Sequence, residues 1–293
     1  MVGMIFTQRS PLQLSLYCKI NVLFKGWELM RILLTNDDGI HSPGLWAIAK
    51  SLEEIGDLTV VVPDRDQSGK GASMTLTSPL TVEKVQTPNG MKSHTYTVDG
   101  TPADCVIMAC ESLCVEPVDL IVSGINQGAN LGLDVFNSGT FGAALHGYFR
   151  GINSIALSVF YRQDVIYSPA ALLGAEIAKI VHDQKSESAI LLNVNLPACD
   201  LKDIKGVDLT TLGPKAYLEN VETVTSGRRT FHWLRHNKPM TVTHQEGTDV
   251  WSINHDRASI TVVNPYLTTD NGSELGDLVL KGSINCLGAI SSD

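Results

Sequence analysis

The sequence predicts an α/β fold with a doubly wound, mostly parallel sheet, followed by a β-rich C-terminal lobe or arm. Three observations lead to this prediction. Short apolar runs rich in Val, Ile and Leu alternate with segments whose apolar residues recur at helical spacing, and turn-forming residues separate them. Such alternation is typical of parallel strands joined by helices. The 293 residues, 43% of them hydrophobic, are also enough for one large domain with a sizeable core.

The first strand, helix and strand set the pattern. Residues 31–35 form an apolar run that ends at a turn-forming Asn-Asp-Asp-Gly sequence, and residues 58–62 form a second run. Between them, Ser42 and Pro43 begin a helix that ends at Gly56. Two strands connected in this way are parallel, so their carboxyl ends lie at the same edge of the sheet.

The alternation continues along the chain. The expected elements are a strand at 118–123, a helix at 140–148, a strand at 155–160, a helix at 169–181 and a strand at 189–194. A hairpin on the sheet edge is expected from segments 81–85 and 93–98, because the Pro-Asn-Gly sequence between them favours a tight turn. In a doubly wound sheet the ligand crevice lies beyond the carboxyl ends of the strands.

The strength of this patterning divides the chain into three parts. Residues 1–29 are an N-terminal extension, residues 30–199 form the core, and residues 200–293 form the β-rich lobe and oligomerisation arm. No helix is predicted in the lobe, which has three strand-like pieces, at 228–234, 240–243 and 258–263. Such a lobe suits contacts between subunits or covering of the crevice.

Composition excludes several classes of protein. The 22 Lys and Arg against 31 Asp and Glu give a net charge of −9, the wrong sign for holding DNA on a basic face. Six cysteines without a C-x-x-C pair are typical of a reducing cytosol rather than of a disulfide scaffold or a cysteine zinc site. Apolar runs are too short to span a membrane. We therefore expect a cytoplasmic protein without DNA or membrane partners.

Two adjacent carboxylates, Asp37 and Asp38, follow the first strand directly. Their repulsion is costly unless a cation or protons offset the charge, and carboxylate and amide oxygens select hard divalent cations. Taken alone, the Asp-Asp-Gly sequence fits a solvated turn better than a metal site.

Two further loops are expected at the same edge of the sheet. The loop after the second strand carries Ser68, whose hydroxyl can join a cation, and the loop after strand 118–123 carries Asn126, which offers an amide oxygen. Backbone amides at the helix start formed by Ser138, Gly139 and Thr140 can bind phosphate or another oxyanion. Each feature alone also fits a surface loop or a helix cap, but three converging loops favour a functional site.

Several sequence blocks between Met30 and Pro197 occur together in one order. They are RILLTNDDGI at 31–40 with SPG at 42–44, PDR at 63–65 with QSG at 67–69, DGTPADC at 99–105, VSGINQGANLG at 122–132, SGT at 138–140 and NVNLP at 193–197. In this order the blocks resemble the family of the stationary-phase survival protein SurE. The resemblance implies a Rossmann-like core and a metal-dependent phosphatase acting on nucleoside 5′- and often 3′-monophosphates. It also implies a C-terminal arm exchanged between subunits of a homodimer or homotetramer.

The resemblance also implies roles for individual residues. The expected ligands of one divalent cation per subunit, Mg²⁺ or Mn²⁺, are Asp37, Asp38, Ser68 and Asn126. Of these, Asp37, Asp38 and Asn126 are also expected to be catalytic. The residues expected to contact phosphate or to support the ligands are Asn36, Gly69, Ser138, Gly139 and Thr140.

The hypothesis is hydrolysis of a nucleoside monophosphate, or of short polyphosphate, by attack of a metal-activated water. Asp37 is the preferred acceptor of the proton from that water. Three alternatives stay open. A phospho-aspartyl intermediate fits less well, because its usual motif is Asp-x-Asp rather than Asp-Asp. The others are a non-catalytic module that senses a nucleotide or metal, and a transferase that uses a nucleotide donor.

Overall fold

The computed structural model describes residues 29–88, 90–161, 165–184, 188–215, 217–239 and 244–266, with single positions at 279, 281, 283 and 284. Residues 1–28 of the expected extension, the expected strand at 240–243 and most of the chain after 266 lie outside the described residues. The chain forms two compact units, Met1–Val263 and Asn264–Asp293. The fold and the site below belong to the first unit.

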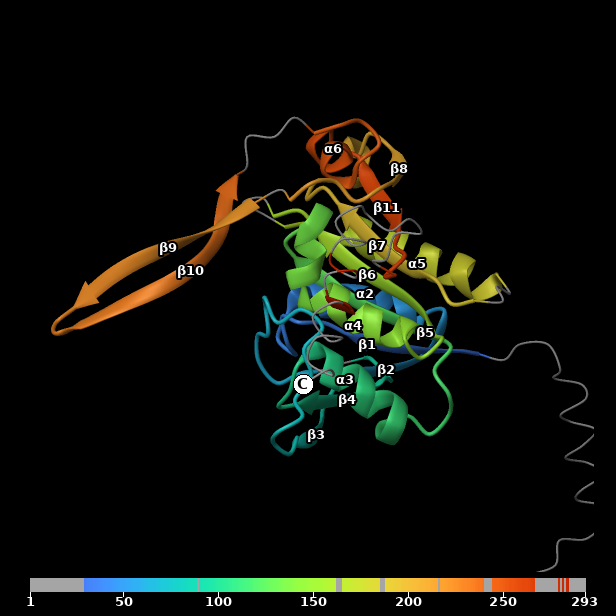
Figure 1. Cartoon of the computed structure of the whole chain (residues 1–293). Helices are drawn as coiled ribbons and strands as arrows, with labels where there is room; N and C mark the ends of the chain where they lie inside the picture. The colour runs from blue at the N-terminus through green and yellow to red at the C-terminus, as the bar shows by residue number, and fades with distance from the viewer. Residues whose placement is uncertain are drawn as a thin grey trace, which may run out of the picture. The chain divides into compact units, whose positions relative to one another are not determined.

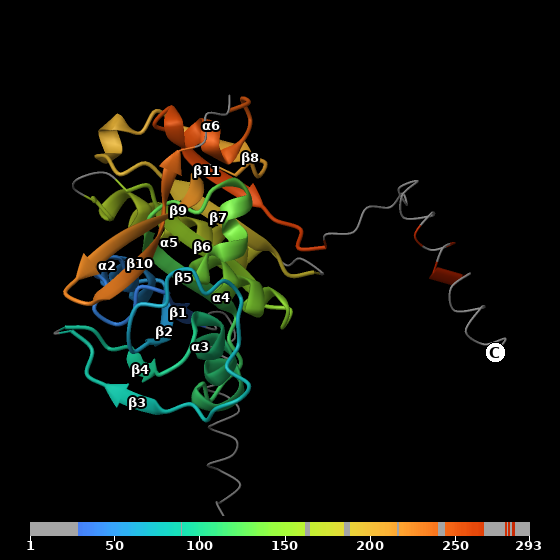
Figure 2. The ribbon, with the colours of Figure 1, turned by 60° about the vertical axis from the view of Figure 1, so that its left-hand side comes forward.

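A nine-stranded sheet with the order β3-β4-β2-β1-β5-β6-β7-β11-β8 forms the centre of this unit (Figures 1 and 2). Six neighbouring strands are parallel: β4 (His94–Val98), β2 (Gly56–Pro63), β1 (Met30–Thr35), β5 (Leu120–Gln127), β6 (Asn153–Val159) and β7 (Leu191–Leu196). The expected edge hairpin is present, with β3 (Val82–Val85) antiparallel to β4. The predicted mostly parallel α/β fold is therefore confirmed.

Helices cover both faces of the sheet, as a doubly wound fold requires. On one face, α2 (Pro43–Glu53) and α5 (Ser168–Asp183) enclose a core that includes Leu34. On the other face, α3 (Pro102–Met108) and α4 (Gly139–Tyr148) enclose a second core that includes Leu33. Successive residues of β1 point to opposite faces, so burial on both sides explains why the strands are continuous apolar runs rather than alternating ones.

The helix α3 is a feature that the sequence pattern did not predict. It begins with a capping box, in which the side chain of Thr101 accepts from the amide of Asp104 at 3.1 Å and Asp104 accepts from the amide of Thr101 at 2.8 Å. A π-helical turn at Ala109–Leu113 follows. The Thr-Pro-x-Asp spacing was the available signal for this helix start. The three cysteines in the segment obscured the helical period.

The part of the chain after residue 200 contributes both to the central sheet and to a separate hairpin. β11 (Ala258–Val262) pairs antiparallel with β7, and β8 (Val207–Thr210) pairs parallel with β11. β9 (Tyr217–Ser226) and β10 (Arg229–Pro239) form a two-stranded antiparallel sheet, called the arm below (Figure 1). The expectation of no helix was wrong, because α6 (Asp249–Asn254) and the short 3₁₀ helix η3 (Leu201–Asp203) are present.

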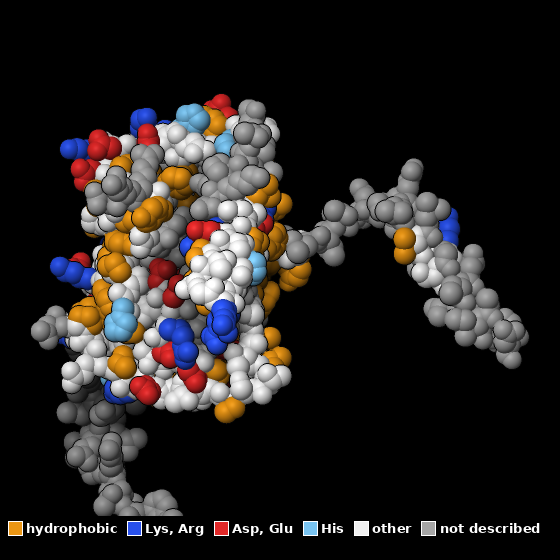
Figure 3. All heavy atoms as spheres, turned by 90° about the vertical axis from the view of Figure 1, so that its left-hand side faces the viewer, with side chains coloured by type: hydrophobic (Ala, Val, Ile, Leu, Met, Phe, Trp, Pro, Cys, Tyr) orange, Lys and Arg blue, Asp and Glu red, His pale blue; other side chains and the backbone are white. Residues whose placement is uncertain are grey.

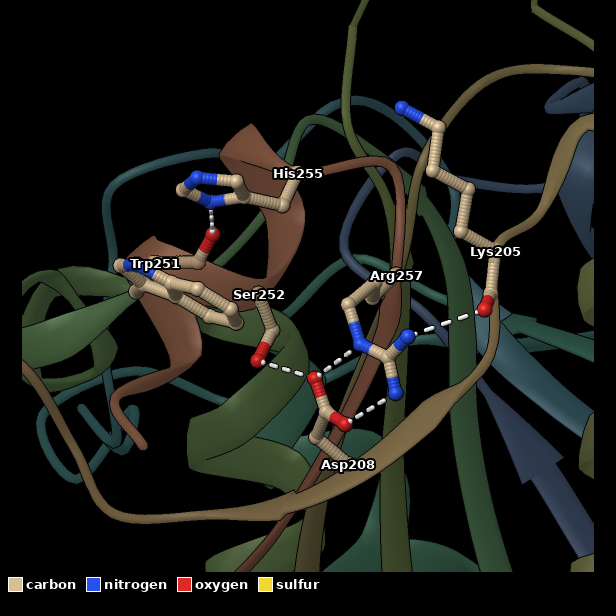
Figure 4. A network of polar contacts seen from close by, with 6 residues as sticks. All are labelled: Lys205, Asp208, Trp251, Ser252, His255 and Arg257. Atoms are coloured by element: carbon tan, nitrogen blue, oxygen red, sulfur yellow. Dashed lines mark hydrogen bonds and ion pairs between the residues drawn. The ribbon is translucent and has the colours of Figure 1, made fainter. Parts of the chain in front are cut away.

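An ion pair and a hydrogen bond tie β8 to the residue before β11 and to α6 (Figure 4). Asp208 on β8 accepts from Arg257 at 2.6 and 2.7 Å, and from the hydroxyl of Ser252 on α6 at 2.8 Å. Arg257 also donates to the carbonyl of Lys205 at 2.9 Å. A four-residue strand and a six-residue helix have little stability on their own. The network stabilises both by fixing them to each other.

Candidate active site

The loops after β1, β2 and β5 meet at the edge of the sheet where these parallel strands end. A cavity of about 700 Å³ opens at this edge. Figure 3 looks at the same side of the molecule and shows a hollow with acidic side chains at its floor. Residues from all three loops, the start of α4 and the arm line the cavity, among them Asp37, Ser68, Gly69, Asn126, Ser138 and Leu234.

Asp37 lies between its own loop and the first turn of α4. Its side chain is buried, and the hydroxyl of Thr140 donates to its Oδ1 at 2.5 Å. A Cβ atom at Gly139 would lie 2.7 Å from the Cβ of Asp37, so only glycine leaves room for the carboxylate there. The positive end of α4 therefore faces this carboxylate and favours its charged form.

Asn36 shapes the turn that carries both carboxylates. Its Nδ2 donates to the carbonyl of Gly39 at 2.9 Å, and its Oδ1 accepts from the amide of Gly39 at 3.2 Å. Gly39 has a φ of +85°, a conformation that glycine adopts without strain. Both ends of the Asn36 amide are therefore used inside the loop, where they support Asp37 and Asp38.

Asp38 is only partly buried and receives two long polar contacts. The hydroxyl of Ser42 lies 3.5 Å from its Oδ2, and the amide of Gln127 lies 3.4 Å from the same atom. Ser42 stands at the N-cap of α2, as the sequence predicts, but its side chain caps no helix amide. The contact with Gln127 joins the first loop to the end of β5, which extends beyond the expected strand end at residue 123, so that Asn126 lies on the strand and not in the loop after it.

The loop that carries Ser68 is held against both neighbours. The amide of Gln67 donates to the carbonyl of Asp37 at 2.8 Å, and the amide of Gly71 donates to the carbonyl of Asn137 at 3.1 Å. Within the loop, one carboxylate oxygen of Asp66 accepts from the amide of Ser68 at 2.8 Å and from its hydroxyl at 2.6 Å. The hydroxyl donates in this contact, so its lone pairs remain free to accept or to coordinate.

Sequence reasoning did not single out Asp66. Aspartate often begins a turn in which its carboxylate accepts a hydrogen bond from the backbone amide two residues later, and this preference was the available signal for Asp66. Three residues of the arm, Glu219, Leu234 and Arg235, also line the cavity without any signal in the sequence that places them there.

Asn126 presents its amide to the same cavity. Its Nδ2 donates to the carbonyl of Gly128 at 2.6 Å, and the amide of Gly128 donates to Val159 at 2.9 Å on the neighbouring strand. Because the nitrogen end of the side chain is used in this way, the oxygen end is the one left for a ligand.

Ser138 caps the helix α4 beside Asp37. Its hydroxyl accepts from the amide of Phe141 at 3.0 Å. The first amides of a helix have no partner within the helix, and those of Gly139 and Thr140 lie in this first turn. They are donors of the kind that binds phosphate.

Negative charge is concentrated at the floor of the cavity. Burial raises the pKa of Asp37 to about 6 against the opposing hydrogen bond from Thr140, and the charge of Asp38 raises it further. Burial also raises the pKa of Asp38, and the charge of Asp66 acts in the same direction. Carboxylates held this close together favour binding of a cation.

The donor set fits a hard divalent cation. Carboxylate, hydroxyl and amide oxygens are the ligands that Mg²⁺ and Mn²⁺ prefer. Within the described ranges, no three or more His, Cys, Asp or Glu side chains are grouped to hold a metal. A cation here would therefore depend on Ser68 and Asn126 as well as on the two aspartates.

A protein-family model described as "Survival protein SurE" matches residues 32–219. This chain belongs to the SurE family. A protein of Dehalococcoides mccartyi strain CBDB1 named 5′-nucleotidase SurE is 43% identical over 240 residues, which cover 81% of this chain and 90% of that protein. One of the same name from Heliobacterium modesticaldum is 39% identical, with 82% and 88% covered.

The solved structures include a SurE protein with the same fold. The crystal structure of the protein from Aquifex aeolicus has a TM-score of 0.69 and 38% identity, and the match covers 81% of this chain and 94% of that one. The resemblance stated from the sequence blocks is thereby confirmed. The residues matched by the family model include all three loops of the cavity.

The expected site residues of this SurE family member fall into two groups. Those that line the cavity are Asp37, Ser68, Gly69, Asn126 and Ser138. The others lie beside them in the chain and contact a member of the first group or shape its loop; they are Asn36, Asp38, Gly139 and Thr140. Their roles as ligands or phosphate contacts stay predictions.

Proposed function

We propose that this chain is a metal-dependent phosphomonoesterase that hydrolyses nucleoside 5′-monophosphates to nucleoside and phosphate. The observation that carries the proposal is the contact between Asp37 and Thr140, which joins the acidic loop to a helix start at the floor of one cavity. Relatives named 5′-nucleotidase, 39–43% identical over most of the chain, support the nucleotidase activity.

In the proposal, the oxygens of Asp37, Asp38, Ser68 and Asn126 would hold one Mg²⁺ or Mn²⁺ ion. When bound, such an ion supplies positive charge to phosphoryl oxygens and lowers the pKa of water. The protein itself has a net charge of −9, so the attraction for an anionic substrate has to be local.

The residues at the start of α4 bind the phosphoryl group. The amide of Gly139 donates to its oxygens, the amide and hydroxyl of Thr140 hold the Asp37 carboxylate beside it, and the Ser138 cap keeps the first turn of the helix in place. In hydrolysis, the water oxygen forms a bond to phosphorus while the bond from phosphorus to the ester oxygen breaks. The attacking water keeps one hydrogen on the new phosphate oxygen and loses the other to the carboxylate of Asp37. The nucleoside oxygen takes up a proton from solvent as it leaves, and Asp37 then returns its proton to solvent, so that the step balances.

The finer parts of the proposal concern substrate range, assembly and location. A cavity of about 700 Å³ is larger than a phosphoryl group alone needs, which supports action on 3′-monophosphates and short polyphosphate as well.

The apolar residues exposed on the arm, such as Phe231 and Trp233, support a homodimer or homotetramer. The free thiols of Cys105, Cys110 and Cys114 support a reducing, cytoplasmic location. Among the described residues, the longest apolar helix is too short to cross a membrane.

Phosphate release from AMP and GMP tests the proposal. We expect release that EDTA abolishes and that added Mn²⁺ or Mg²⁺ restores. Release that persists in EDTA would refute metal dependence. Binding of AMP without release would favour the sensing module, and transfer of a group to an acceptor would favour the transferase.

The chemical route is tested separately. Mass spectrometry of enzyme quenched in acid during turnover is expected to show unmodified aspartates, because water attacks phosphorus directly. A phosphorylated Asp37 or Asp38 would instead establish the covalent route.

A further inference from the structure

A buried carboxylate outside the cavity joins two segments that border it. Asp249, in the first turn of α6, is fully buried. Its Oδ2 accepts from the amide of Gly132 at 2.7 Å, and its Oδ1 accepts from the amides of Gly213 and Val250, both at 2.8 Å. Three backbone donors from three separate stretches of chain therefore meet on one side chain.

The two glycines at this junction are in direct contact. Gly132 has a φ of +54°, and a Cβ atom there would lie 2.2 Å from the carbonyl oxygen of Pro214. A Cβ atom at Gly213 would lie 3.1 Å from Oδ1 of Asp249. The segments thus cross with no space between their backbones, so a movement of one displaces the other.

One of these segments leads to the phosphate-binding end of the cavity. Gly132 begins the 3₁₀ helix η2 (Gly132–Asn137), and Ser138, the cap of α4, follows it immediately. The carbonyl of Asn137 also accepts from Gly71 in the loop that carries Ser68. The position of η2 therefore sets where the first turn of α4 and its amides lie.

The other segment leads to the base of the arm. Two residues after Gly213, the ammonium group of Lys215 lies 2.5 Å from a carboxylate oxygen of Glu219 on β9 and 3.9 Å from Oδ1 of Asp134 on η2. Both acids line the cavity, as does Leu234 of β10. The segment that leads into the arm is thus connected to η2 twice, by the charge of Lys215 and by the carboxylate of Asp249.

We propose that Asp249 is a positioning residue of the phosphate-binding site: by holding Gly132 and Gly213 together, it fixes η2 and the start of α4 against the base of the arm. The inference rests on the proposed function, because it assigns phosphate binding to the start of α4. Burying a carboxylate costs free energy, and an apolar side chain would fill the same space without that cost. The carboxylate is explained by the hydrogen bonds that it accepts from the backbone, which fix the positions of these segments.

The test compares Asp249→Asn with the wild type. Asparagine keeps the size of the side chain, but its amide nitrogen cannot accept from Gly132 or Gly213, so one of these contacts is lost. Calorimetry measures the dissociation constant of inorganic phosphate in the presence of Mn²⁺, and kinetics measure KM and kcat for AMP, well below the melting temperature. We expect the phosphate dissociation constant and KM to rise together by about tenfold, the lower end of the effect of outer-shell partners.

Asp208→Asn is the matched control. Asp208 is another hydrogen-bonded aspartate that contacts α6, but its partners are Arg257 and Ser252 rather than the loops of the cavity (Figure 4). This variant is expected to lower the melting temperature without changing phosphate binding or KM. If Asp249→Asn changes phosphate binding and KM no more than the control does, Asp249 is only structural and the inference is wrong.

A second variant decides the question if Asp249→Asn does not fold. Gly213→Ala places a methyl group 3.1 Å from Oδ1 of Asp249 and 3.0 Å from Val250, which shifts the junction by tenths of an ångström. It is expected to weaken phosphate binding about threefold, a fraction of the outer-shell effect. Unchanged binding in this variant would overturn the inference.

The binding measurement also separates this inference from the proposed function, because it needs no turnover. A wild-type protein that binds phosphate but releases none from AMP would count against the proposed function alone.

Discussion

The hydroxyl of Thr140 donates a hydrogen bond to Oδ1 of Asp37, although the two residues lie 103 positions apart in the sequence. Both side chains are buried. The contact joins the loop after β1 to the first turn of α4, and so it connects the proposed cation-binding and phosphate-binding sides of one cavity.

Removing the Thr140 hydroxyl is expected to impair the site more than the fold. Thr140→Val keeps the shape of the side chain but leaves the buried carboxylate of Asp37 without this donor. We expect kcat/KM for AMP to fall by about 10- to 100-fold, as for other partners that orient a metal ligand. Thr140→Ser retains the donor and is expected to stay within a few-fold of the wild type. Equal activities in the two variants would show that the hydrogen bond does not matter.

A methyl group at Gly139 is expected to displace Asp37. The added Cβ would lie 2.7 Å from the Cβ of Asp37, which is too close for both to stay in place. Alanine otherwise stabilises a helix by about 0.5–1 kcal/mol relative to glycine, so the effect on activity is separable from helix stability. We expect Gly139→Ala to lower kcat/KM by more than about tenfold.

The control for this prediction is Gly227→Ala at the turn of the arm. Gly227 has a positive φ but nothing within 4 Å of an added Cβ, so its strain stays local. This variant is expected to change the melting temperature and leave kcat/KM unchanged. A similar loss of activity in both variants would contradict the steric explanation.

The architecture of the core was predictable because its strands are buried on both faces. A continuous apolar run such as 58–62 can be recognised without knowing what covers it, and Ser42 and Pro43 signal a helix start locally. The convergence of the loops then follows from parallel strands alone. The position of β8 could not be predicted in this way, because its four residues alternate in exposure and pair with β11, about 50 residues later in the chain.

The contacts that shape the site were beyond prediction from spacing. The sequence places Asn36 next to the carboxylates, but it does not predict that the side-chain amide of Asn36 pairs with the backbone of Gly39. The contact between Asp249 and Gly132 spans 117 positions, and no local pattern distinguishes this aspartate from a helix-start residue. The strand β9 was missed because its polar and apolar residues give no continuous run, since both faces of the arm are largely exposed.

Asp37→Asn is expected to abolish cation binding while leaving the fold intact. The change removes a charge from the acidic cluster that would hold the ion, and the neutral side chain is a weaker ligand for a hard cation. We expect the affinity for Mn²⁺, measured by calorimetry, to fall by more than about 100-fold, beyond the effect typical of outer-shell partners. Phosphate release from AMP is expected to fall with it.

Asp119→Asn is the control for cation binding. Asp119 pairs with Arg31 at the amino end of β1, away from the cavity, with contacts of 2.7 to 2.9 Å. This variant is expected to bind Mn²⁺ as the wild type does. Turnover close to that of the wild type by Asp37→Asn with added Mn²⁺ would reject Asp37 as a ligand.

The ion pair between Asp208 and Arg257 is expected to make stability depend on pH in the acid range. Hydrogen bonds from Arg257 hold the pKa of Asp208 below its usual value. A carboxyl whose pKa is lower in the folded state stabilises the fold above its unfolded pKa, and this contribution is lost as the pH falls through the folded value. Asp208→Asn removes the charge and is expected to lower the free energy of unfolding by about 1–3 kcal/mol at pH 7.

Urea unfolding of the wild type and of Asp208→Asn at several pH values checks this dependence. The difference between them is expected to be constant from pH 7 to about pH 5 and to shrink below about pH 4, where the wild-type carboxyl takes up its proton. Asp200→Asn, which disrupts the exposed pair with Lys202, is expected to change stability by less than about 1 kcal/mol at any pH. If the difference for Asp208→Asn persists unchanged at pH 3, packing rather than charge accounts for the contribution of this residue.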